Sequence, residues 1–256
     1  MLVSLVIPSF QQASLLRGAL QSIKNQIFKD YEIIVMDGGS TDGTAAIVRE
    51  FKQLPVTIYS EPDNGIYDAM NKGIARSTGD FIYFMGCDDR LYAFDTLKNV
   101  FSTPGIINNH VIYGDVVFSD TGKRYDGEFN DFKLMAGNIC HQAIFVRREV
   151  FEKLGNFDIR YKTYADWEHN MRWFSTSWVK RQYLSIIIAN FNTSGFSSQL
   201  QDELFFGELE HIRNKYFPKI IRYLAANPYR PLHWRLIKFL TSNRILLMRK
   251  IASLLK

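Results

Sequence analysis

The chain is poor in cysteine, with Cys87 and Cys140 the only two among 256 residues. Two cysteines are too few for a disulfide framework or a four-ligand zinc site, which favours a reducing compartment. Long apolar runs are also missing, since none approaches the roughly 18 residues that a membrane-spanning helix needs. The opening residues carry no basic leader and reach Pro8 too early for a signal-peptide core. We therefore expect a globular protein that works in the cytoplasm.

Two glycine-rich phosphate-binding loops are absent. The first apolar stretch, residues 3–7, is not followed by Gly-x-Gly-x-x-Gly, and Gly-x-x-x-x-Gly-Lys-Ser/Thr occurs nowhere in the chain. These absences exclude the backbone cradles that dinucleotide-binding enzymes and P-loop proteins build around phosphates. A nucleotide diphosphate that is held through a metal ion on carboxylates needs no such loop.

Acidic residues are absent from the end of the chain. After Glu210 the sequence has eleven Lys and Arg residues and no Asp or Glu, whereas the first 210 residues carry 20 basic and 26 acidic ones. The net charge of +5 therefore hides an acidic body and a basic tail. This division argues against a uniformly basic, nucleic-acid-like surface. We expect no nucleic acid among the partners.

Apolar stretches alternate with helical patterns in the first part of the chain. Residues 3–7, 31–36, 56–59 and 81–85 are short, apolar and typical of buried strands. Between them we expect helices at about residues 15–25, 44–53 and 66–75. Short connections of this kind predict right-handed crossovers. The pattern predicts an α/β fold with a Rossmann-like, mostly parallel central sheet and helices on both faces.

Polar residues follow the predicted strands. The carboxyl ends of parallel strands meet at one edge of a sheet, where ligands bind. Each residue alone has a simpler explanation, because Asp favours turns and helix caps, but four strand ends together favour a site. Adjacent carboxylates repel, and Mg²⁺ or Mn²⁺ would neutralise such a pair. The residues at these ends are Pro8, Ser9, Asp37, Glu61, Asp63, Asp88 and Asp89.

Four motifs in the first half resemble family 2 glycosyltransferases of the GT-A fold, in order and in spacing. They are residues 6–10, 33–44 and 61–75 and the pair Asp88-Asp89. The likeness covers about residues 3–195 and is nearest to the bacterial polysaccharide group of the colanic-acid type. It implies a domain over residues 1–200. Residues 1–110 form the nucleotide-sugar half, 111–200 the acceptor half and 201–256 a tail.

The resemblance implies a donor site for a nucleotide-diphosphate sugar, such as a UDP-sugar, with Mn²⁺ or Mg²⁺ on Asp88 and Asp89. Three positions depart from the family pattern. Gly86 stands where the first Asp of the Asp-x-Asp motif usually is, Gln11 replaces a common Asn, and Met70 replaces a common Arg, for which Lys72 is a candidate substitute. The expected donor contacts are Pro8, Ser9, Asp37, Glu61, Asp63, Asp68, Lys72 and Asp88.

The second half resembles the family again at residues 141–143, 154–158 and 164–168. The resemblance implies that Asp166 is the general base, with His141 and Gln142 at the acceptor and the ring of Trp167 available for stacking on a sugar. Glu168 is a rival base, but two residues along a helix it should face away from Asp166. A plain helix-capping role for Asp166 is the alternative.

The tail combines basic charge with apolar residues at helical spacing from residue 231 onward, including Trp234 and Phe239. A basic amphipathic helix of this kind suits an anionic membrane surface. A helix packed on the core, or a dimer contact, is the alternative. We expect a peripheral protein on the inner face of the cell membrane.

Three functions fit these features. The first is an inverting glycosyltransferase of cell-surface polysaccharide synthesis that moves a sugar to a saccharide or lipid-linked saccharide. The second is a catalytically silent protein of the same fold that binds sugar nucleotides or polysaccharide. The third is a glycoside hydrolase, because carboxylate pairs also cleave sugars, although a hydrolase needs no nucleotide-binding rim.

Overall fold

The computed structural model describes residues 1–125, 127–192 and 202–226. The basic helix expected from residue 231 onward lies outside the described residues. None of the helices among the described residues combines the length and the hydropathy of a membrane span.

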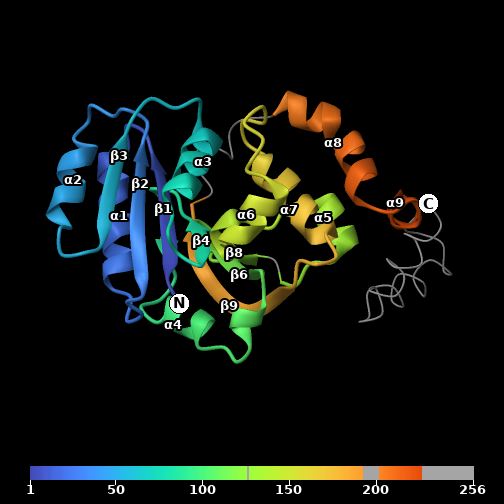
Figure 1. The fold of residues 1–256 in the computed structure, drawn as a ribbon, viewed down its shortest axis with the longest axis horizontal. Helices are drawn as coiled ribbons and strands as arrows, with labels where there is room; N and C mark the ends of the chain where they lie inside the picture. Colours follow the sequence, from blue (N-terminus) through green and yellow to red (C-terminus); the bar gives the residue numbers. More distant parts are fainter. Residues whose placement is uncertain (126, 193–201, 227–256) are drawn as a thin grey trace.

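The first half is a parallel sheet with helical crossovers (Figure 1). Its strands are β1 (Val3–Ser9), β2 (Tyr31–Asp37), β3 (Val56–Ser60) and β4 (Phe81–Phe84), which lie in the order β3-β2-β1-β4. The connecting helices are α1 (Ala13–Lys24), α2 (Thr44–Glu50) and α3 (Ile66–Arg76). All three strand pairs are parallel, as the alternation of strands and helices predicts.

The second half extends the same sheet in the order β4-β8-β6-β9-β5, with β7 paired to β6. Its strands are β5 (Arg90–Leu91), β6 (Val111–Phe118), β7 (Arg124–Tyr125), β8 (Ile144–Arg147) and β9 (Arg181–Phe191). The helices are α4 (Thr96–Phe101), α5 (Asp131–Ala136), α6 (Arg148–Leu154) and α7 (Ala165–Ser175), with 3₁₀ turns η1 (Ile106–Asn108) and η2 (His141–Ala143). Here β8 runs antiparallel to β4 and β6, whereas β6 and β9 are parallel.

Alternating side chains divide the interior into two cores. Successive residues of a strand point to opposite faces, so Leu5 packs with Leu16 and Leu20 of α1 on one face, while Val6 packs with Met70 of α3 on the other. Fully burying a Leu or Ile contributes roughly 1.5–3 kcal/mol. The apolar stripe of α1 therefore fixes this helix against the sheet.

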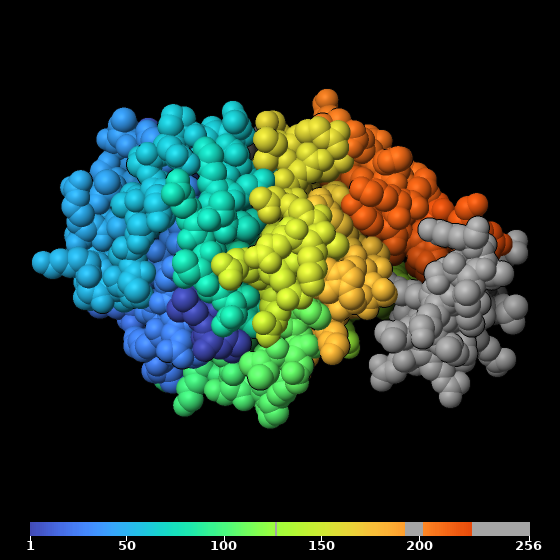
Figure 2. All heavy atoms as spheres, in the orientation of Figure 1, coloured from blue at the N-terminus to red at the C-terminus, as the bar shows by residue number. Residues whose placement is uncertain are grey.

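The two halves form one body, and Figure 2 shows them packed together without a gap on the visible face. A side-chain amide reinforces the contact. Asn71 of α3 donates to the carbonyl of Phe157 at 2.9 Å and accepts from its N–H at 3.0 Å. Phe157 in turn packs against Tyr67 and Phe84 of the first half. The sheet edge that both halves share is therefore held in fixed geometry.

The described part of the tail packs onto this body. Helices α8 (Glu203–Tyr216) and α9 (Lys219–Ala226) bury Phe205, Ile221 and Leu224 in the same core as α7. Tyr216 donates to Glu168 of α7 at 2.6 Å. Residues 202–226 thus share a core with the acceptor half, and the division expected at residue 200 is not a break in packing.

Candidate active site

The turn after β4 carries two carboxylates in different environments. Asp89 is 1% exposed, and its oxygens accept from Gly86 N–H at 3.0 Å, Gln142 Nε2 at 2.9 Å and Asn192 N–H at 3.3 Å. Asp88 is partly exposed and accepts from Asn192 Nδ2 at 3.2 Å. Burial, together with the neighbouring charge of Asp88, raises the pKa of Asp89. Asp88 is therefore the carboxylate open to a ligand, and Asp89 is the one that holds the turn.

Gly86 lies against both carboxylates. A Cβ atom at this position would stand 2.8 Å from Asp88 Oδ1 and 2.9 Å from Asp89 Oδ2, closer than real Cβ contacts. An aspartate at position 86 would therefore displace one of the two side chains. Glycine at this position, in place of the usual Asp, leaves room for both carboxylates, and its backbone N–H donates to Asp89.

The donor set at this turn suits a hard cation that keeps most of its positions for other ligands. Among the described residues no three His, Cys, Asp or Glu side chains come together as a metal cluster. Mg²⁺ and Mn²⁺ commonly use one or two carboxylates and complete their coordination with substrate phosphate. The partly exposed Asp88, with Asp89 behind it, meets that requirement.

Arg90 holds the turn from behind. Its guanidinium donates to the carbonyls of Cys87 at 3.0 Å and Asp89 at 2.5 Å, and to Leu15 of α1 at 3.3 Å. Gly18 makes room for it, because a Cβ there would lie 2.0 Å from Arg90 Nη2. This clamp between α1 and the turn was not indicated by the sequence pattern.

The other strand ends line the same edge. Ser9 is paired with Asp37 in the register of β1 and β2, and its buried hydroxyl has no hydrogen-bond partner among the described residues. The carbonyl of Pro8 accepts from the Cys87 thiol at 3.4 Å, which joins this end to the turn after β4. The structure therefore brings Pro8, Ser9, Asp37 and Asp88 together.

Asp37 is buried and held by neighbours. It accepts from Ser60 Oγ at 2.5 Å and from Ser40 N–H at 3.1 Å. Asp63 lies beside it, since a side chain at Gly38 would meet Asp63 Oδ2 at 2.5 Å. Two carboxylates on adjacent strand ends suit a ligand rich in hydrogen-bond donors, such as a base and a ribose.

Lys72 lies beside two acidic side chains of the first half. It donates to the carbonyl of Pro62 at 2.6 Å and lies 3.4 Å from Asp68 and 3.8 Å from Glu61. Asp68 also accepts from Asn64 N–H at 2.9 Å at the start of α3. Lys72 therefore faces Asp68 and Glu61 in the structure, and the donor-binding roles of these three residues stay a prediction.

Asp166, at the start of α7, is bound by four donors. Oδ1 accepts from Tyr67 Oη at 2.8 Å and Trp167 N–H at 2.9 Å, and Oδ2 accepts from Asn138 Nδ2 at 2.9 Å with His141 Nδ1 at 3.3 Å. Its side chain is only 8% exposed. The carboxylate is therefore held in one orientation from both halves of the protein.

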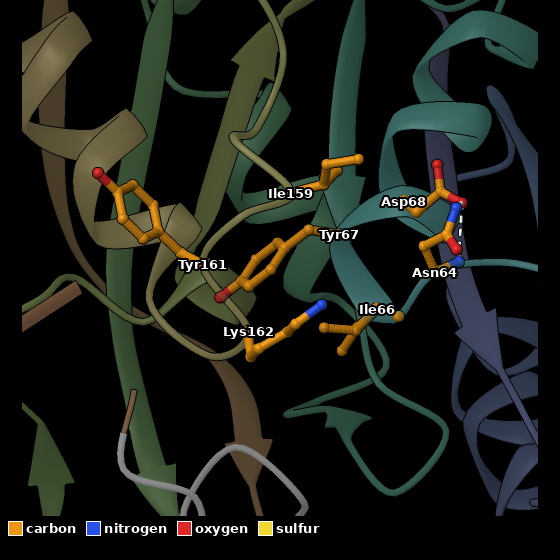
Figure 3. A pocket seen from close by; sticks show the side chains of 8 residues that line it. Asn64, Ile66, Tyr67, Asp68, Ile159, Tyr161 and Lys162 are labelled. Carbon is orange, nitrogen blue, oxygen red and sulfur yellow. Dashed lines mark hydrogen bonds between the residues drawn. The ribbon is translucent and has the colours of Figure 1, made fainter. Parts of the chain in front are cut away.

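Figure 3 shows a pocket that is lined by Tyr67, the residue whose hydroxyl donates to Asp166. The first turn of α3 and the loop around Tyr161 and Lys162 line it. Burial and the charge of Asp166 raise the pKa of the Tyr67 phenol well above its ordinary value. Tyr67 consequently stays protonated and remains a hydrogen-bond donor to Asp166.

A two-residue segment joins Asp166 to the turn after β4. His141 contacts Asp166, and the next residue, Gln142, donates to Asp89. The backbone between them is fixed, because Tyr83 Oη donates to the carbonyl of Gln142 at 2.9 Å. The structure thus places His141 and Gln142 between the predicted donor site and the predicted acceptor site.

Two neighbours of Asp166 have structural roles. Glu168 forms an ion pair with Arg172 and accepts from Tyr216, so it faces α8 and is not available as a base. Trp167 is 6% exposed and donates its indole N–H to the carbonyl of Leu134 at 2.7 Å. The stacking role expected of Trp167 does not fit this position, because a buried indole presents no open face to a sugar.

Comparison with known proteins identifies this arrangement of strand ends and carboxylates. The profile described as "Glycosyl transferase family 2" matches residues 4–184. The chain belongs to this family. The match includes Asp37, Asp88 and Asp166, and the narrower colanic-acid-type group stays a prediction.

Relatives of this family 2 glycosyltransferase agree with the assignment. A Mycobacterium tuberculosis protein named "PGL/p-HBAD biosynthesis glycosyltransferase" is 38% identical over 215 residues, which cover 80% of this chain and 83% of that one. The structure of S. aureus TarS with UDP-GlcNAc has a TM-score of 0.70 at 17% identity and covers 84% of this chain and 66% of that one. The mannosyltransferase PcManGT from Pyrobaculum calidifontis with GDP-Man and Mn²⁺ has a TM-score of 0.61 at 18% identity, over 98% of this chain and 73% of that one. The two structures share the fold.

Sequence reasoning missed several residues of the glycosyltransferase site. Tyr67 lies inside the motif at residues 61–75, but no pattern indicates that its hydroxyl reaches Asp166. Asn138 and Asn192 carry no motif at all. Their contacts arise from the packing of segments that are distant in the chain.

Proposed function

We propose that this glycosyltransferase is an inverting enzyme that transfers a sugar from a nucleotide-diphosphate donor, such as a UDP-sugar, to a hydroxyl of a saccharide acceptor. The observation that carries the proposal is the link through residues 141 and 142. These two residues connect the carboxylate turn after β4 with Asp166, so that a donor diphosphate and an acceptor hydroxyl meet in one site.

The donor is held at the edge formed by β2, β1 and β4. Asp37 and Asp63 accept hydrogen bonds from the base and ribose, and the buried hydroxyl of Ser9 gains a partner when the nucleotide binds. Asp88, supported by Asp89, holds Mn²⁺ or Mg²⁺. When bound, the cation supplies positive charge to the leaving diphosphate. The neighbour with GDP-Man and Mn²⁺ supports this assignment of a donor and a metal to the fold.

Asp166 is the general base on the acceptor side. A group that removes the acceptor proton during attack typically contributes about 10²–10⁴ in rate. Four donors fix the orientation of this carboxylate. Alignment of donor and acceptor supplies a further large share of the rate. Attack from the face opposite the diphosphate inverts the anomeric centre.

The basic tail fits an acceptor that is carried on a lipid. Beyond Ala226 the sequence keeps seven Lys and Arg residues with no acid, together with Trp234 and Phe239. Each basic residue near an anionic leaflet contributes about 1 kcal/mol to binding. We propose that the tail docks on the inner face of the cell membrane and that the protein serves cell-surface polysaccharide synthesis.

The experiment is a donor screen on the full-length protein. UDP- and GDP-linked sugars are incubated with Mn²⁺ or Mg²⁺, with soluble saccharides and with lipid-linked saccharide extracts, and release of nucleoside diphosphate is measured. We expect metal-dependent release from at least one donor, and strong loss of release in Asp166→Asn. Tight donor binding without turnover in the presence of every acceptor would instead indicate a silent sugar-nucleotide-binding protein.

A further inference from the structure

The hydroxyl of Tyr67 lies between two acceptors. Its oxygen is 2.8 Å from Asp166 Oδ1 and 2.8 Å from the backbone carbonyl oxygen of Thr163. A phenol carries a single hydrogen, whereas a carbonyl and an ionised carboxylate only accept hydrogen bonds. The hydroxyl can therefore donate to only one of the two at a time, and the two contacts compete for the same hydrogen.

The charge of Asp166 decides which acceptor takes the hydrogen. Tyr67 is 4% exposed, and burial, with the charge of Asp166 next in size, raises the pKa of its phenol well above the ordinary value, so the hydrogen stays on the phenol. A hydrogen bond to an ionised acceptor is roughly twice as strong as one between neutral groups. The hydrogen thus points to Asp166 while this carboxylate is ionised. Once Asp166 takes a proton this advantage is lost, and the carbonyl of Thr163 offers the phenol a second acceptor.

Both acceptors of the Tyr67 hydroxyl are fixed in place. The N–H groups of Lys162 and Thr163 donate to Asp202 Oδ2 at 2.5 Å and 3.1 Å, which holds the loop that carries the Thr163 carbonyl. Asp202 is itself buried at the N-terminal cap of α8. The ring of Tyr67 packs against Phe157, with 5.5 Å between the ring centroids. The hydrogen can therefore change partner by rotation of the hydroxyl alone, without movement of the ring or the loop.

We propose that Tyr67 is a positioning residue for the base: its hydroxyl holds Asp166 while the carboxylate is ionised and turns to the Thr163 carbonyl when Asp166 takes the acceptor proton. This proposal rests on the proposed function and deepens it. The acceptor oxygen forms a bond to the anomeric carbon while the bond from that carbon to the diphosphate breaks. The diphosphate leaves with the electron pair, and the hydroxyl proton passes to Asp166, which returns it to water after the product leaves. Tyr67 keeps its own hydrogen throughout.

Other charged or titratable groups surround this pair of residues. They are Asp68 of α3, His141 of η2, Lys162 of the loop before α7, Glu168 of α7 and Asp202 at the cap of α8. All of them are the same in the wild type and in a variant that changes only Tyr67. The difference between the pH profiles of the two proteins therefore reports the Tyr67 hydroxyl.

The test is Tyr67→Phe in the full-length protein, with the donor and acceptor that the wild type turns over. The variant keeps the ring that packs against Phe157 and lacks only the hydroxyl. We expect turnover at neutral pH to fall about 10–100-fold, the range for loss of one hydrogen bond to a charged group, while affinity for UDP with Mn²⁺ stays within about twofold. The deficit should widen as the pH falls, because a hydrogen bond to the charged form favours that form.

Two controls separate positioning from a structural role. Tyr161 lines the same pocket, but its hydroxyl donates to Glu208 at 2.5 Å, and Figure 3 shows the two tyrosine hydroxyls pointing in different directions. Tyr161→Phe should therefore leave the shape of the pH profile unchanged. In an Asp166→Asn background, Tyr67→Phe should cause less than about a twofold further loss of turnover, because Tyr67 acts through Asp166.

Several outcomes would overturn the proposal. One is a folded Tyr67→Phe with the turnover and the pH profile of the wild type. Another is a loss that is equal at every pH and multiplies fully with the loss in Asp166→Asn, which would make the role of Tyr67 structural. If Tyr67→Phe does not fold, 3-fluorotyrosine at position 67 decides, because it keeps the hydroxyl, donates more strongly and should extend activity to lower pH; an unshifted profile contradicts the proposal. Absence of turnover by the wild type with every donor would contradict the proposed function instead.

Discussion

Gln142 donates its side-chain amide to the carboxylate of Asp89 at 2.9 Å, across 53 residues of sequence. Because the preceding residue contacts Asp166, one short segment touches the acidic group of each half. Displacement of this segment would change the distance between donor and acceptor. The geometry of the site therefore depends on Asp89 as a structural anchor, and the partly exposed Asp88 is the carboxylate that we propose as the metal ligand.

This division predicts different defects for the two aspartates. Asp88→Asn should weaken Mn²⁺-dependent donor binding with little change in the free energy of unfolding, because an amide is a poorer ligand for a hard cation. Asp89→Asn should destabilise the protein by about 1–3 kcal/mol, because buried donors lose their acceptor. Calorimetric titration of UDP with and without Mn²⁺, and urea unfolding, measure the two effects. Gln142→Leu is the control, and it should couple with Asp89→Asn in a double-mutant cycle. Equal defects for Asp88→Asn and Asp89→Asn in both assays would contradict the division.

Gly18 and Arg90 should be energetically coupled. Gly18→Ala forces the guanidinium away from the carbonyls that it binds, and so loosens the turn that carries Asp88. In an Arg90→Ala background the same change meets no guanidinium and should stabilise α1 by up to about 1 kcal/mol, the helix preference of Ala over Gly. We expect a coupling energy of about 0.5–3 kcal/mol from urea unfolding of the four proteins. Additive effects would show that Arg90 does not hold the turn through this contact.

Buried His169 should make the protein less stable in mild acid. Burial lowers the pKa of His169 from its ordinary value of 6.5 to about 3. Between these values the unfolded chain binds a proton that the folded chain does not, so stability falls as pH decreases. The slope from this group is up to about 1.4 kcal/mol per pH unit. His110 acts in the same direction, because burial lowers its pKa too, whereas the raised pKa of Asp89 acts against it.

Urea unfolding at several pH values between 6.5 and 5 tests the role of His169. His169→Gln should show a smaller slope of unfolding free energy against pH than the wild type. The exposed residue His211 supplies the matched control, and His211→Gln should leave the slope unchanged. An unaltered slope in His169→Gln would assign the acid sensitivity to other groups.

The tail should be required for membrane docking and dispensable for folding. A chain that ends at Ala226 retains α8 and α9 with their buried Phe205 and Leu224, and we expect it to unfold at the same urea concentration as the full chain. It should no longer float with anionic liposomes at low salt, and it should still turn over soluble acceptors. Flotation equal to that of the full chain would exclude docking through residues 227–256. Unfolding on truncation would indicate that the tail packs on the body.

The sequence predicts the donor edge well for a physical reason. Strands that are buried on both faces are continuous apolar runs, so their ends, and the polar residues after them, are visible in the sequence. The positions of Ser9, Asp37 and Asp88 at one sheet edge follow directly from parallel pairing. The assignment of Asp166 came from resemblance, because a lone acid at a helix start has no distinctive pattern.

The rest depends on packing between distant segments. Asp88 and Asp89 are adjacent and chemically identical, and only Gln142 and Asn192, 53 and 103 residues after Asp89, make one buried and the other open. The resemblance implies an open ring for Trp167, yet Phe205 of α8 packs against it. No local pattern encodes such contacts.

The central claim is inverting transfer from a nucleotide-diphosphate sugar, and proton NMR of the first-formed product tests it most directly. The full-length protein is incubated with Mn²⁺, its acceptor and a donor of known anomeric configuration, and the coupling constant of the anomeric proton is read before mutarotation can interfere. The account predicts that an α-linked donor gives a β-linked product, and that Asp166→Asn forms it at a strongly reduced rate. A product with the anomeric configuration of the donor would contradict the account.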